Sequence, residues 1–81
     1  MKILVISLYD YSYCYNAYKI ENGKASDVKI TTKIIDNIFA KIHKRDNYNE
    51  ELYKNYIKDY DVVIFCEDGG CEILEWKSSN E

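Results

Sequence analysis

The sequence predicts an α+β fold, a two-layer sandwich in which two helices cover one face of a mixed, mainly antiparallel sheet of about five strands. Two short apolar runs predict strands that are buried on both faces, and two dipeptides with strong turn chemistry predict hairpins. Between the hairpins, the apolar residues change to a helical spacing. The expected order is β-β-β-α-α-β-β, in a single domain over residues 1–76 with a polar tail, 77–81, that frays.

Composition limits the classes of protein to consider. With 81 residues, of which 47% are apolar, the chain has room for one core, and its net charge of −3 has the wrong sign for general nucleic-acid binding. No apolar run approaches the length of a membrane span, and the N-terminal run is too short for a signal peptide. The three cysteines, an odd number without secretory features, favour reduced thiols and a cytoplasmic location.

Two segments are expected at the centre of the sheet. Residues 2–8 and the run from Val62 to Phe65 are apolar at consecutive positions, so we expect them to be neighbours, with a parallel orientation as our hypothesis. Their sequences, KILVISL and YDVVIFCEDGG, resemble two strands of flavodoxin-like doubly wound proteins. The resemblance implies a strand pattern alone, because the glycine and Ser/Thr phosphate loop of those proteins is missing after Leu8.

The segment after the first strand has two interpretations. Tyrosines alternate with smaller residues there, at Tyr9, Tyr11, Tyr13 and Tyr15. If the strand continues, these four side chains share one face. A bend near residues 10–12 is the alternative, because a strand from Lys2 to Ile20 would exceed the usual length.

The next elements are a hairpin and a helix. Asn22-Gly23 is the strongest short turn signal in the chain, and it would pair Ala17 with Val28. From Thr31 the apolar residues follow one helical stripe, and Thr31 or Thr32 is expected to cap the helix. The stripe comprises Ile34, Ile35, Ile38, Phe39 and Ile42.

A second helix is expected after a break at residues 45–47. Its apolar positions again have helical spacing, and they include four tyrosines that we expect in the core: Tyr48, Tyr53, Tyr56 and Tyr60. Asn47 with Glu50 three residues later resembles a capping box, so we expect Asn47 to begin this helix.

The closing hairpin turns at Asp68-Gly69. This register pairs Cys66 with Cys71 and Phe65 with Glu72, and it avoids placing two glutamates opposite each other. By strict alternation, Glu67 and Glu72 fall on the face of Phe65, whereas Glu75 falls on the other face.

The chain has few cysteine and histidine side chains, and their spacing is unlike that of a metal site. Cys66 and Cys71 form a candidate thiol pair, although two small apolar residues on one face are the simpler interpretation. Adding Cys14 and His43 gives the ligand count of a zinc site without its close cysteine spacing, so we expect no metal. No motif surrounds Cys14 or His43, so we also expect no catalytic residues and no cofactor.

The functional hypothesis is binding without catalysis. Nine tyrosines are an unusual number for 81 residues, and tyrosine is a preferred contact residue in protein interfaces. A tyrosine-rich face and an acidic hairpin are thus expected to occlude a protein or ribonucleoprotein partner. Small size and an A/T-rich coding composition fit a phage or mobile-element inhibitor of a host defence nuclease complex, of the anti-CRISPR type. The expected contact residues are Tyr9, Tyr11, Tyr13, Tyr15, Glu67, Asp68 and Glu72.

Two alternatives remain open. In the first, the protein binds a small ligand or nucleotide, or is an enzyme, with a pocket at the carboxyl ends of the two central strands. Tyrosine hydroxyls, Asp10, Glu67 and Asp68 would supply its polar groups. In the second, the chain is a structural homodimer that pairs through an exposed sheet edge.

Overall fold

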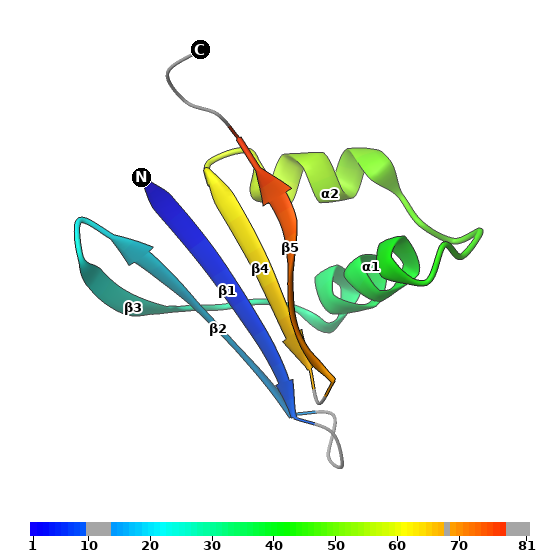
Figure 1. The fold of residues 1–81 in the computed structure, drawn as a ribbon. Helices are drawn as coiled ribbons and strands as arrows, with labels where there is room; N and C mark the ends of the chain where they lie inside the picture. Colours follow the sequence, from blue (N-terminus) through cyan, green and yellow to red (C-terminus); the bar gives the residue numbers. More distant parts are fainter. Residues whose placement is uncertain (10–13, 68, 78–81) are drawn as a thin grey trace.

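The computed structural model describes residues 1–9, 14–67 and 69–77. They form a five-stranded mixed sheet in the order β3-β2-β1-β4-β5, with two helices on one face (Figure 1). The predicted class and element order are therefore confirmed. The strands are β1 (Lys2–Tyr9), β2 (Cys14–Glu21), β3 (Lys24–Val28), β4 (Val62–Glu67) and β5 (Gly70–Trp76), and the helices are α1 (Thr32–Ile42) and α2 (Glu50–Ile57).

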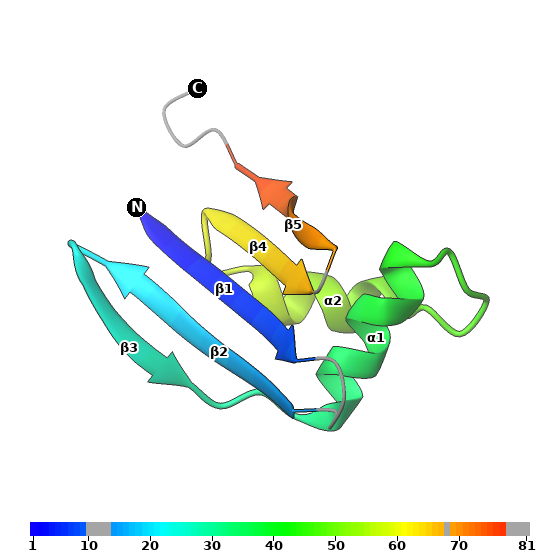
Figure 2. The same ribbon diagram turned by 60° about the horizontal axis from the view of Figure 1, so that its bottom comes forward.

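The two apolar strands are neighbours at the centre of the sheet, and they run parallel. In this pair Ile3 lies opposite Val62 and Ser7 opposite Cys66, whereas every other strand pair in the described sheet is antiparallel. The sequence-based hypothesis is thus confirmed. Because the strands are parallel, their carboxyl ends reach the same edge of the sheet (Figure 2).

The β2–β3 hairpin has the predicted register, with Ala17 opposite Val28 and Glu21 opposite Lys24. Its two turn residues, Asn22 and Gly23, have φ angles of 55° and 78°. A two-residue hairpin loop with positive φ at both positions is the type I′ turn that an Asn-Gly sequence favours.

Strands β1 and β2 are antiparallel, with Tyr9 opposite Cys14. The chain therefore reverses direction between these two residues, and the position of the predicted bend, near residues 10–12, lies outside the described residues. One continuous strand through Tyr15 is wrong. Tyr11 and Tyr13 lie outside the described residues, so the structure does not test their predicted role.

A bulge in β5 corrects the predicted alternation. Ile64 lies opposite Ile73, but Val63 lies opposite Glu75, which leaves Leu74 as an extra residue. Because one inserted residue exchanges the two faces of a strand, Glu75 belongs to the helix-covered face. The prediction that it lies on the other face is wrong.

The core lies between the helices and the central strands. Phe65 of β4 contacts Phe39 of α1 edge to face, with ring centroids 5.6 Å apart. Burying each large apolar side chain contributes about 1.5–3 kcal/mol, so this layer dominates the stability of the fold. Its fully packed members are Leu4, Ile6, Ala17, Ile35, Ile38, Tyr53, Ile57, Val63 and Phe65.

The helix caps confirm one prediction and correct another. Thr31 caps α1 as expected, since its hydroxyl accepts a hydrogen bond from the Ile34 N–H at 3.2 Å. At α2 the cap is Asn49, whose side-chain oxygen accepts from the Leu52 N–H at 3.0 Å. The prediction of Asn47 is wrong, because contacts with Asn37 hold Asn49 in the extended conformation that a cap requires.

Candidate binding surfaces

The carboxyl ends of β1 and β4 define the first candidate surface. The last residue of β1, Tyr9, pairs with the start of β2, and the last residue of β4, Glu67, pairs with Gly70 at the start of β5. We call this the strand-end edge, marked by residues 9, 14, 67 and 70. The ends of β1 and β4 lie side by side at this edge (Figure 1).

The acidic residues of the hairpin are exposed at the strand-end edge. Glu67 and Glu72 line a small hollow of about 190 Å³ together with Phe65, Gly69, Gly70 and Cys71. They share the helix-covered face, as predicted, because Glu72 lies opposite Phe65. Asp68 lies outside the described residues, and Tyr9 and Tyr15 are placed here only by backbone register.

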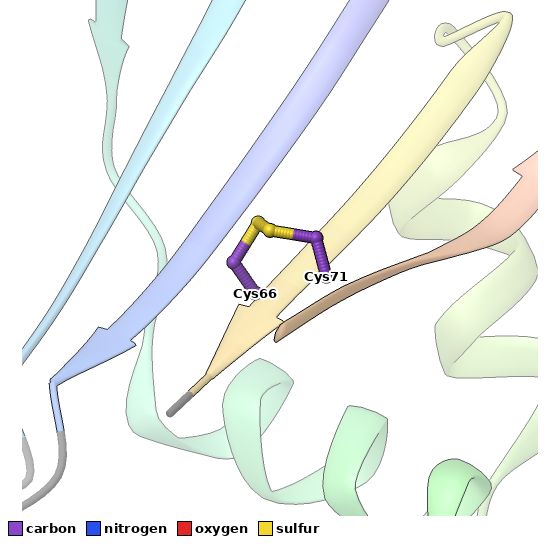
Figure 3. Close-up of a disulfide and its surroundings, with 2 residues drawn as sticks. All are labelled: Cys66 and Cys71. Atoms are coloured by element: carbon purple, nitrogen blue, oxygen red, sulfur yellow. A yellow bond between two sulfur atoms is a disulfide. The ribbon is translucent and has the colours of Figure 1, made fainter. Parts of the chain in front are cut away.

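Cys66 and Cys71 occupy opposite positions in β4 and β5, in the register that the sequence predicted. Their Cα atoms are 4.0 Å apart, and the two sulfur atoms form a disulfide (Figure 3). Opposed residues at narrow positions of an antiparallel pair bring their Cβ atoms close together, which explains the bond. The sequence had favoured reduced thiols here, whereas the structure contains the oxidised pair.

The sheet face turned away from the helices is a second candidate surface, which we call the open face. Two large apolar side chains are strongly exposed on it: Ile73 at 57% and Trp76 at 63% of their full accessible area. Register assigns to it Ile3, Val5, Ser7, Asn16, Tyr18, Ile20, Ala25, Asp27, Val62, Ile64, Cys66, Cys71, Ile73 and Trp76.

The open face was not predicted from the sequence. Strict alternation would have placed Trp76 with Leu74 on the helix side, whereas the bulge places it opposite Val62. One signal was present: Ile73 and Leu74 are consecutive apolar residues that break the alternation of β5. A bulge directly after Ile73 keeps Leu74 and Glu75 on the helix-covered face and turns Trp76 to the open face.

A pocket of about 690 Å³ lies beside α1, next to the end of β1. Its cationic and acidic side chains are Arg45, His43 and Asp36, and the His43 ring stacks on Phe39 with centroids 5.9 Å apart. Leu8, Thr32, Ile35 and Asn47 complete the lining. The pocket lies near the end of β1, where the sequence placed a ligand site, but α1 and the loop that follows it supply the polar groups.

The tyrosines of the second helical segment belong to the interior, as their spacing predicted. Tyr53 is 2% exposed, and the Lys41 ammonium lies 4.7 Å from its ring centroid. The hydroxyls of Tyr48, Tyr53 and Tyr56 are buried, with no hydrogen-bond partner in the part of the chain that the structure describes. Burial raises the pKa of Tyr53 strongly and that of Tyr56 to about 12.

Neither a metal site nor a membrane-spanning helix in the described residues, nor a similar known protein, was found to assign a function. Among residues 1–9, 14–67 and 69–77, no group of three or more His, Cys, Asp or Glu side chains converges to hold a metal ion. No helix in the same ranges combines the length and apolarity that crossing a bilayer requires. No family model, curated protein or solved structure matches this chain.

Proposed function

We propose that the protein acts without catalysis, by occupying the surface of another protein or ribonucleoprotein through the strand-end edge. The supporting observation is the parallel pairing of β1 with β4. This pairing brings the tyrosine-rich segment and the acidic hairpin, which lie far apart in sequence, to one edge of the sheet. A surface made from both segments can offer aromatic contact area and negative charge to the same partner.

The charge of this edge favours a basic partner surface. Glu67 and Glu72 are exposed there, and the chain carries a net charge of −3. Acidic side chains repel phosphates, so the edge would mimic nucleic acid instead of binding it. A cytoplasmic phage or mobile-element inhibitor that occludes a host nuclease complex, as anti-CRISPR proteins do, is the specific form of this proposal.

The experiment is an affinity pull-down from host lysate, followed by titration of the recovered partner. Tyr11→Ala with Tyr13→Ala should weaken binding at least tenfold, and Glu67→Gln with Glu72→Gln should slow association most strongly at low salt. Glu51→Gln with Asp59→Asn is the matched control, because it removes two exposed negative charges away from the edge. Full binding by both edge variants contradicts the proposal.

The pocket beside α1 supports a second candidate function, binding of a small ligand. Arg45 and His43 can hold an anionic group, while Phe39 and Leu8 offer apolar contact to the rest of the molecule. Nucleotides and flavins combine these two properties. A thermal-shift screen with both classes should show stabilisation that Arg45→Ala abolishes, and the absence of any shift removes this candidate.

A further inference from the structure

The open face differs from the solvated face of an ordinary two-layer fold. An antiparallel sheet covered on one side normally alternates apolar residues toward the core with polar residues toward water. Here the central strands are apolar on both sides: Val5 and Ile64 point away from the helices, whereas their neighbours Leu4 and Val63 belong to the core. The outward side of the sheet is therefore apolar across β1 and β4, although Val5 and Val62 are already buried there. The strongly exposed apolar side chains of the face are Ile73 and Trp76.

The bulge extends this apolar surface onto the edge strand. Without it, β5 would place Glu75 beside Ile73 on the open face. With it, the outward positions of β5 are Cys71, Ile73 and Trp76, and Glu75 turns to the helix side. Exchanging a glutamate for an exposed tryptophan would weaken an isolated monomer's solubility, so the arrangement indicates a surface that is covered.

The charge distribution of the open face is compatible with packing against a second copy of the same face. Asp27 of β3 is the only charged residue among the strand positions that the structure describes on this face. A two-fold contact places like residues near one another, so charges close to the axis would repel. With the axis through the centre of the sheet, at β1 and β4, the two Asp27 side chains lie at separate rims.

The size of the face is sufficient for a weak dimer. Five strands about 4.8 Å apart, each about 20 Å long, cover roughly 500 Å² of sheet plane. Two copies together bury about 1,000 Å² or more once side-chain relief is included, which is the lower limit for a specific interface. Interfaces of this size are at the weak and transient end, so the dimer is expected to dissociate on dilution.

We propose that a second copy of this chain covers the open face, so that two sheets pack face to face with the helices outside. Aligned sheets pack about 10 Å apart at a small angle, and interdigitating apolar side chains fill the layer between them. Ile73 and Trp76 are the strongly exposed apolar contacts that each copy contributes from β5. The strand-end edge stays outside this interface, so the inference does not depend on the proposed function.

Sedimentation equilibrium and the fluorescence of Trp76, the only tryptophan, test the proposal together. From low-micromolar to sub-millimolar protein, the mass should rise toward twice 9.6 kDa. The emission of Trp76 should shift to shorter wavelength over the same range, since its indole leaves water. A dimer through the β3 edge or a helix would double the mass without this shift, and that result overturns the proposal.

Single substitutions test whether the dimer forms through the open face. Ile73→Lys places two like charges inside the interface and should weaken the dimer at least tenfold, whereas Asn55→Lys adds the same charge on the exposed side of α2 and should leave it unchanged. If Ile73→Lys does not fold by circular dichroism, Trp76→Ser replaces it. A monomer at every concentration, or a different protein that protects Ile73 and Trp76, overturns the proposal.

Discussion

Asn37 on α1 and Asn49 before α2 are joined by two hydrogen bonds. The Asn37 Nδ2 donates to the carbonyl oxygen of Asn49 at 2.9 Å, and the Asn49 N–H donates to Asn37 Oδ1 at 2.8 Å. Asn37 is 7% exposed, the one polar side chain among the buried residues that the structure describes. The pair fixes the start of α2 relative to α1, because both backbone groups of the cap residue are bound.

Replacing Asn37 should therefore destabilise the fold. In Asn37→Ala both hydrogen bonds are lost, and the Asn49 carbonyl keeps only the Tyr53 N–H, so the change should cost about 1–3 kcal/mol. Urea denaturation measures this loss as a lower transition midpoint at unchanged slope. Asp36→Ala, at the exposed neighbouring position, is the control, and an equal loss there would contradict the role of the pair.

The caps of α2 can be distinguished by paired substitutions. Asn49→Ala removes the side-chain oxygen that accepts from the Leu52 N–H, so it should cost about 1 kcal/mol of stability. Asn47→Ala should change stability by less than about 0.5 kcal/mol, because Asn47 is exposed and does not cap the helix. Thermal unfolding of the two variants measures the difference, and the reverse order would restore the sequence-based assignment of Asn47.

The disulfide between Cys66 and Cys71 should contribute modestly to stability. The residues are 5 apart in sequence. Closing so short a loop lowers the conformational entropy of the unfolded chain, which raises the free energy of the unfolded state by about 2 kcal/mol at 25 °C. Adding a thiol reductant, or substituting Cys66→Ser with Cys71→Ser, should lower the melting temperature by about 8–16 °C. The double variant should be insensitive to reductant, and continued sensitivity would assign the effect to another thiol.

Alkaline pH should destabilise the protein through the tyrosines of α2. The folded state raises the pKa of Tyr56 to about 12 and that of Tyr53 further, above the ordinary value of 10.0. Between these values the unfolded chain has released the proton and the folded chain has not, so stability is full below pH 10 and falls as pH rises above it. Partial exposure of Tyr56 limits the size of the effect.

Phenylalanine substitutions test this assignment. Tyr53→Phe removes a buried hydroxyl that has no partner among the described residues, so stability at neutral pH should be retained or increased. Tyr53→Phe with Tyr56→Phe should also flatten the decline in melting temperature between pH 9 and about 12. Tyr18→Phe on the open face is the control, and an unchanged decline in the double variant would exclude the α2 tyrosines as its cause.

The local elements were determined by the sequence itself. Asn22-Gly23 specified its turn and thereby the pairing of Ala17 with Val28, and the register at Cys66 and Cys71 followed from the same kind of turn chemistry. The apolar stripes of α1 and α2 were sufficient to place both helices over the core. Interactions between near neighbours in the chain decide these features, so a single sequence carries them.

Packing between distant segments decided the rest. Asn49 became the cap of α2 in place of Asn47 because Asn37, on another helix, binds its backbone. The bulge beside Leu74 turned Glu75 toward the helices and Trp76 away from them, since the edge strand has to follow the twist of β4 while it packs Leu74 against the core. The meeting of the carboxyl ends of β1 and β4 was predicted on the hypothesis that these strands are parallel neighbours, and the sheet pairing, which joins distant segments, decided that hypothesis. The position of Trp76 on the open face depends on one inserted residue, whose effect on both sides of the strand is fixed only when the whole sheet has formed.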